Sequence, residues 1–172
     1  MTDKGQSDTY AIVGELVLVA SALDAELNRV TAAALRLGDA PLLLPVIATF
    51  DPTRKIEMLR ARVSHFTRTS WKHALLQFVG RVETVNKYRD LACRTPTVRE
   101  GGRWAFKPTV FANLLEPLDP SAKKPTPRAF VRDLKSAIRL GEYALREAVT
   151  IRCMIEQAAE ERAKHEAARA AK

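Results

Sequence analysis

The apolar residues of this chain recur at three- and four-residue steps over most of its length, the spacing that places side chains on one face of an α-helix. The first stripe predicts a long helix that Ser7 or Asp8 caps and that Gly38 terminates. Its apolar positions are Val13, Leu16, Ala20, Leu23, Leu27, Val30, Ala34 and Leu37. The strongly apolar residues 41–50, which include two prolines, predict a short buried helix or turn rather than a strand.

Two further helices are predicted by their start signals. Asp51 is expected to cap the second helix, with Pro52 at its first position, and Thr69 or Ser70 is expected to cap the third. Their buried faces are predicted to contain Ile56, Leu59, Val63 and Phe66 in the second helix, and Trp71, Leu75, Phe78, Val82 and Val85 in the third.

The helical pattern fades after Arg94. Thr95-Pro96 breaks the helix and Gly101-Gly102 makes a turn, so a small β-hairpin or an ordered loop is expected near residues 96–112. Residues 116–127 contain four prolines and are interpreted as a connector. A last helix is expected to start at Thr126-Pro127. Its apolar face is predicted to contain Phe130, Leu134, Ile138, Gly141, Leu145, Ala148 and Ile155.

The sequence therefore predicts an all-α fold, an up-and-down bundle of about four to five helices with a small hairpin or ordered loop before the last one. Residues 1–155 are expected to form a single helical domain, large enough to bury a core. Residues 156–172 have a helix-forming composition without a substantial apolar stripe, which predicts a charged helical extension or a frayed tail.

The net charge of +8 is unevenly distributed. Residues 54–103 carry twelve Lys and Arg against four Asp and Glu, whereas residues 1–53 carry three against seven. A basic middle segment attracts phosphate backbones or an acidic protein partner. A merely solvated basic surface, or pairing with the acidic first segment inside the fold, is an equally open interpretation.

Several classes of protein are disfavoured by the sequence. No run approaches the roughly 18 apolar residues that span a bilayer, and the N-terminus does not resemble a signal peptide, so no membrane partner and a cytoplasmic location are expected. Cys93 and Cys153 are not in Cys-x-x-Cys spacing and the three histidines offer no close pair, so no metal is expected. The sequence lacks a Gly-rich phosphate loop and the motifs His-Glu-x-x-His and Gly-x-Ser-x-Gly. It therefore indicates no particular enzyme class, and no cofactor is expected.

The most unusual stripe lies at the end of the third helix, where Asn86, Arg89 and Cys93 continue the predicted core-facing line. Each has a structural interpretation. Asn86 can hydrogen-bond a neighbouring helix, Arg89 can bond carbonyls or a carboxylate such as Asp24 or Glu15, and Cys93 can be a small buried apolar residue.

The same segment carries a resemblance to a known family. With Val85-Asn86-Lys87-Tyr88-Arg89-Asp90-Leu91-Ala92-Cys93-Arg94 late in the third helix, and a β-like insertion before the last one, the chain resembles the HEPN superfamily, specifically its small bacterial members. In that family a helix ends in Arg-Asn, three or four residues and His. Arg89 matches the arginine, Asp90 stands where the family has Asn, and Cys93 stands where it has the catalytic His, with one residue fewer between them than in the family pattern. The resemblance covers roughly residues 9–153.

The resemblance implies a homodimer, in which the Arg and His of two protomers line a cleft and assist attack of a ribose 2′-hydroxyl on the adjacent phosphate. An imidazole suits that proton transfer, whereas a thiol at Cys93 does not, and the Asp90 carboxylate would repel a phosphate. The motif positions Arg89, Asp90 and Cys93 are therefore expected to be catalytically inactive.

A second candidate surface combines basic residues with an aromatic ring on the Gly-turn loop, and loops carry function disproportionately. With the polar residues of the motif, the expected binding residues are Asn86, Arg89, Arg94, Arg99, Arg103, Trp104 and Lys107.

Three functions follow as hypotheses. The first is a catalytically degenerate HEPN-like protein that binds RNA or a protein partner, in a defence, stress or toxin–antitoxin setting. The second is a metal-independent endoribonuclease with Arg89 at a dimer cleft. The third is a helical adaptor with no nucleic-acid role, whose basic middle segment binds an acidic protein.

Overall fold

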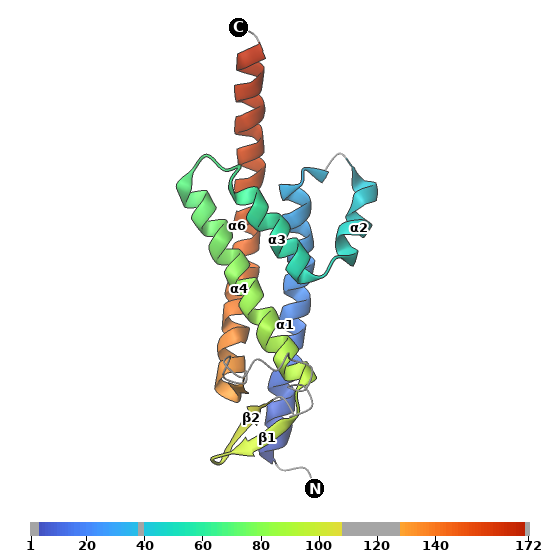
Figure 1. Ribbon diagram of the computed structural model, residues 1–172, viewed down its shortest axis with the longest axis vertical. Helices are drawn as coiled ribbons and strands as arrows, with labels where there is room; N and C mark the ends of the chain where they lie inside the picture. The colour runs from blue at the N-terminus through green and yellow to red at the C-terminus, as the bar shows by residue number, and fades with distance from the viewer. Residues whose placement is uncertain (1–3, 38–39, 108–127, 171–172) are drawn as a thin grey trace, which may run out of the picture. The chain divides into compact units, whose positions relative to one another are not determined.

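The computed structural model describes residues 4–37, 40–107 and 128–170, and over these ranges the chain is helical with one small antiparallel sheet (Figure 1). The helices are α1 (Lys4–Ala34), α2 (Leu44–Thr49), α3 (Pro52–Val63), α4 (Thr69–Arg94) and α6 (Val131–Ala170), with a 3₁₀ turn η2 (Pro41–Leu43) before α2. The strands are β1 (Thr97–Glu100), β2 (Arg103–Phe106) and β3 (Ala129–Phe130). The predicted all-α fold with a small hairpin after the third long helix is confirmed.

The chain divides into two compact units, each built from two stretches of sequence. Unit 1 contains Met1–Ala20 and Thr84–Leu140, and unit 2 contains Ser21–Glu83 and Gly141–Lys172. The helices α1, α4 and α6 each give one segment to unit 1 and the other to unit 2. No helix in the described ranges has a stretch that is long and apolar enough to cross a membrane.

The core of unit 2 follows the predicted stripes. Its fully or nearly fully buried side chains include Leu23, Leu27 and Val30 of α1, Ile56 and Leu59 of α3, Leu75, Phe78 and Val82 of α4, and Ala148, Ile151 and Ile155 of α6. Each set recurs at helical spacing, which confirms most of the predicted faces. In the second helix, however, Val63 is only partly buried, and Phe66 is buried but lies beyond the end of α3. In unit 1 the same stripes bury Leu16 and Ala20 of α1, Val85 of α4, and Leu134 and Ile138 of α6.

Both ends of α1 differ from the prediction. The helix begins at Lys4, so Ser7 and Asp8 lie inside it and do not cap it. It ends at Ala34, and Arg36 takes a left-handed conformation with φ 56°. Glycine usually supplies this conformation at a helix end. Here Arg36 adopts it instead, so α1 ends before Gly38, which itself lies outside the described residues.

The segment of η2 and α2 is helical as predicted, but it is not buried. Leu42 is 88% exposed, Leu43, Leu44 and Val46 are also exposed, and Ile47 is the buried residue of α2. A helix of six residues makes fewer than two turns, so few of its side chains can face a core at once. The prediction that residues 41–50 are buried, which rested on their apolar composition, is therefore wrong for most of this segment.

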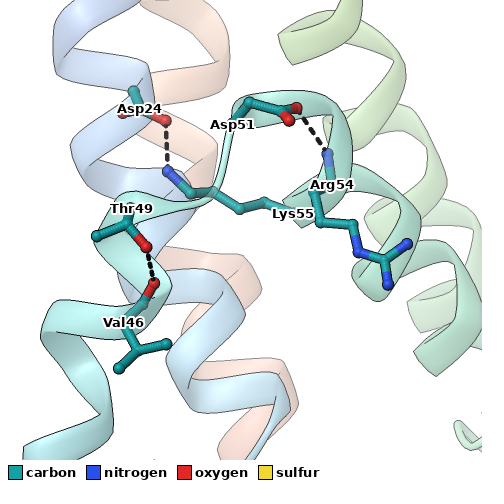
Figure 2. A network of polar contacts seen from close by, with 6 residues as sticks. All are labelled: Asp24, Val46, Thr49, Asp51, Arg54 and Lys55. Carbon is teal, nitrogen blue, oxygen red and sulfur yellow. Dashed lines mark hydrogen bonds and ion pairs between the residues drawn. The ribbon is translucent and has the colours of Figure 1, made fainter.

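The start of α3 and its link to α1 are fixed by polar contacts (Figure 2). The Asp51 carboxylate accepts a hydrogen bond from the Arg54 N–H at 3.0 Å, and Pro52 occupies the first turn, which confirms the predicted cap. Four residues after the cap, the fully buried Lys55 extends to Asp24 of α1, with Nζ and Oδ1 2.9 Å apart. This ion pair joins two elements of unit 2.

The sheet of unit 1 confirms the hairpin and adds a strand that the sequence did not predict. β1 and β2 are joined by Gly101-Gly102, whose φ angles of 55° and 77° suit a two-residue type I′ hairpin turn. β3 pairs with β2, with Phe130 opposite Ala105.

The predicted start of the last helix at Thr126-Pro127 is wrong, because β3 precedes the helix and α6 begins only at Val131; Thr126 and Pro127 themselves lie outside the described residues. The Asp133 carboxylate accepts a hydrogen bond of 2.8 Å from the Phe130 N–H, so this backbone donor just before the first residue of α6 has a partner. At its other end α6 continues as a helix to Ala170.

Candidate functional site

The motif segment occupies the last turns of α4, in unit 1. Asn86 and Arg89 are half-buried, Ala92 is buried, and Cys93 is exposed. The core-facing line therefore continues through Ala92, seven residues after the buried Val85, and Cys93 lies beside it. The interpretation of Cys93 as a small buried apolar residue is wrong, and its free thiol faces solvent.

Arg89 is held by its sequence neighbour. Its Nε and Nη2 both donate to Oδ1 of Asp90, at 3.0 Å and 2.7 Å. The expected carboxylate partners Asp24 and Glu15 are not the ones it uses. A phosphate that approached this guanidinium would meet the Asp90 carboxylate as well, which remains 44% exposed. The motif arginine is therefore locally neutralised.

The remaining motif residues differ in exposure and hydrogen bonding. Oδ1 of Asn86 is buried and accepts no hydrogen bond from any described residue, while Arg94 is exposed at the end of the helix. Among the described residues, no group of three or more His, Cys, Asp or Glu side chains is placed to hold a metal ion.

A larger concave surface lies elsewhere in unit 1. A groove of about 580 Å³ is bordered by the first turns of α1, the tip of the hairpin and the start of α6. We call it the hairpin groove; its lining residues are Gly5, Asp8, Thr9, Ile12, Gly102, Arg103, Trp104, Phe130, Val131, Arg132 and Lys135. Its volume lies within the usual range of ligand sites.

The lining of the hairpin groove contains three cations, two aromatic residues and one carboxylate, that of Asp8. Arg103 and Lys135 are exposed and form no ion pair with the described residues. Arg132 is 3.5 Å from Asp133 through its Nε, and its guanidinium carbon lies 5.6 Å from the centre of the Phe130 ring. Trp104 and Phe130 are half-buried, and both line the groove.

The other predicted binding residues of the hairpin segment are Arg99 and Lys107. Arg99 lies directly opposite Trp104, on the same face of the sheet, and Glu100 lies opposite Arg103. Lys107 follows the far end of β2, where its N–H donates to the Pro96 carbonyl at 3.4 Å. The structure thus brings Arg103 and Trp104 into the hairpin groove, and leaves Lys107 and the motif residues out of its lining.

Sequence reasoning missed the part of the groove that comes from the start of α6. Phe130 was assigned to the buried face of a helix, and Arg132 and Lys135 were not singled out. The two basic residues lie three positions apart in the first turns of α6, but only the pairing of β3 with β2 places them beside the hairpin tip. Comparisons with protein-family models, with curated proteins and with solved structures found no match to this chain.

Proposed function

We propose that this protein binds single-stranded RNA in the hairpin groove and does not cleave it, as a catalytically degenerate member of the HEPN superfamily. The observation that carries the proposal is the composition of the groove, which Arg103, Arg132 and Lys135 line together with Trp104 and Phe130. Cations that follow a phosphate backbone, together with aromatic rings on which bases stack, are the two elements of single-strand binding.

The state of the motif supports binding without cleavage. Arg89 is paired with Asp90, and Cys93 offers no imidazole for transfer of the 2′-hydroxyl proton. The homodimer and the defence, stress or toxin–antitoxin setting that the resemblance implies stay predictions.

Replacing Trp104 by alanine is expected to weaken binding of a fluorescently labelled single-stranded RNA by about 5- to 150-fold, because loss of one base–aromatic stack costs about 1–3 kcal/mol. Arg103→Ala is expected to weaken binding less and to flatten the dependence of log affinity on log salt by about 0.7, the value for one lost phosphate contact in a single strand. Fluorescence anisotropy over a salt series measures both changes.

Lys107→Ala is the matched control, because Lys107 is an exposed cation on the same hairpin segment but does not line the groove. It is expected to change affinity by less than twofold. Equal losses from Arg103→Ala and Lys107→Ala would contradict the groove and indicate a diffuse basic surface. Binding that is absent or insensitive to salt would favour the adaptor function instead.

The absence of cleavage is tested separately on the motif. Incubation of the purified protein with RNA in a chelator is expected to leave the RNA intact, and Arg89→Ala is expected to change neither this result nor binding in the groove. Asp90→Asn is the informative companion, because it frees the Arg89 guanidinium from its carboxylate while keeping the size of the side chain. Cleavage by the wild-type protein that disappears in Arg89→Ala would overturn the proposal in favour of a metal-independent endoribonuclease.

A further inference from the structure

Three arginines of unit 2 border one small cavity. Arg36, Arg62 and Arg162 line it together with His65, and its apolar wall includes Phe66 and Ile155. The cavity measures about 20 Å³, and the hairpin groove shares none of its lining residues.

Each of the three cations comes from a different element. Arg62 lies in the last turn of α3, and Arg162 lies on the long helix α6. Arg36 follows the end of α1 in the left-handed conformation, and its Nη2 donates to the Ala159 carbonyl at 3.4 Å. That backbone conformation costs an arginine about 1 kcal/mol or more, so the surrounding structure holds this side chain beside α6 against a local preference.

These arginines differ from most others in the same unit. Six have a carboxylate within ion-pair distance: Arg29, Arg54, Arg60, Arg68, Arg81 and Arg152. Among the described residues, Arg36, Arg62 and Arg162 have no such partner. Burial lowers the pKa of the Arg62 guanidinium below its ordinary value, and the positive charges of Arg36 and Arg162 lower it further.

The cavity has room for a group the size of one oxygen atom, since about 10–15 Å³ by this measure accommodates a water. An anion can therefore place one oxygen in the cavity while its other oxygens meet the surrounding guanidinium groups. A carboxylate carries a single negative charge, which leaves most of the cluster uncompensated. A phosphate carries up to two and has several acceptor oxygens, and planar guanidinium forks match its geometry.

We propose that Arg36, Arg62 and Arg162 form a binding site for a phosphate group, supplied as free inorganic phosphate or by a small phosphomonoester. His65 at the cavity wall adds a ring nitrogen that can donate to the same ligand. The proposal does not depend on RNA binding.

Inorganic phosphate is the first probe, compared with sodium chloride at equal ionic strength in thermal unfolding of the whole protein. At ten times the dissociation constant, phosphate is expected to raise the Tm of the wild type by about 3–5 °C. Arg62→Met keeps an apolar side chain about as long as the aliphatic stem of arginine and removes the central charge. It is expected to abolish the specific rise while unfolding, without phosphate, at the wild-type temperature or above, because it relieves repulsion among like charges.

Arg60→Met is the matched control, since Arg60 lies on the same helix, is exposed and pairs with Glu83. It is expected to retain the full response to phosphate. Phosphate also stabilises proteins non-specifically through exclusion from their surface, so the difference between the Arg62 and Arg60 variants decides the matter. If Arg62→Met does not fold, Arg162→Met replaces it. A full phosphate response in the folded Arg62→Met or Arg162→Met variant overturns the proposal.

A nucleoside 5′-monophosphate, tested against the same nucleoside without phosphate, distinguishes the two sources of the group. A shift with both the monophosphate and inorganic phosphate supports a site for the free anion. A shift with the monophosphate alone, lost in Arg62→Met, supports a site for a phosphomonoester. Equal shifts with the nucleoside and the monophosphate contradict the role of the phosphate group.

Discussion

Replacement of Asp24 by alanine is expected to lower the free energy of unfolding by about 3 kcal/mol, a large part of the 5–15 kcal/mol typical of a folded domain. The reason is the ammonium group of Lys55, which has no exposed surface and lies 2.9 Å from the Asp24 carboxylate. Without that carboxylate the positive charge stays buried and uncompensated. We expect the lower end of the usual range because Asp24 is itself 34% exposed, so some water can reach the position it vacates. Urea unfolding measures the change.

The double variant Asp24→Ala with Lys55→Met is the decisive companion. Methionine fills the volume of the lysine stem without a charge, and replacing a buried ion pair by apolar side chains is often nearly neutral. The double variant is therefore expected to regain most of the lost stability, to within about 1 kcal/mol of the wild type. Glu57→Ala is the control, because it removes a surface ion pair between Glu57, which is 56% exposed, and Arg54, which is 63% exposed. It should lower the free energy of unfolding by less than about 0.5 kcal/mol. A loss below about 1 kcal/mol for Asp24→Ala would show that Lys55 does not need its partner.

Phe78→Ala is expected to destabilise the protein by about 3–5 kcal/mol, because the ring has no exposed surface and its removal leaves a cavity in the core of unit 2. The midpoint of urea unfolding should fall while its slope stays constant, since the unfolded chain exposes nearly the same area.

Leu76→Ala is the control for Phe78→Ala. Leu76 is two residues away on the same helix and 45% exposed, so the truncation is expected to cost less than about 1 kcal/mol. Similar losses from the two variants would contradict the assignment of the buried face of α4.

Phe78 also illustrates what the sequence could predict. Its burial follows from the helical spacing between Leu75 and Val82, and one periodic stripe is enough to identify the core side of a long helix. The Gly101-Gly102 turn was equally accessible, because two consecutive glycines supply the positive φ angles that a two-residue hairpin needs. Fold class and core faces are local properties of the chain, and local patterns predicted them.

Local sequence patterns did not predict the burial of short segments or the position of the candidate sites. The apolar composition of residues 41–50 does not reveal that Leu42 lies outside the core, because exposure depends on what packs against a short helix. Lys55 is the opposite case: a lysine side chain is almost never fully buried unless it is paired, and here the proximity of Asp24 makes the burial tolerable. Both outcomes depend on contacts between residues far apart in the sequence.

Both candidate sites also depend on contacts between residues that are far apart in the sequence. The hairpin groove needs Lys135 beside Arg103, and the arginine cavity needs Arg162 beside Arg36, although more than 30 and more than 120 residues separate these pairs in the chain. Arg89 was found by its motif, yet its partner turned out to be the adjacent Asp90. A motif identifies a residue type at a position, but the neighbouring charge decides what that residue can still bind.

The division of the chain into units has a consequence for how such a protein can change over generations. Unit 1 joins residues 1–20 to residues 84–140, and unit 2 joins residues 21–83 to residues 141–172. A single genetic crossover transfers one continuous stretch, so it cannot deliver either unit intact to another protein. The RNA-binding groove proposed for unit 1 and the phosphate site proposed for unit 2 are therefore expected to be inherited together, as parts of one gene that recombination does not readily separate.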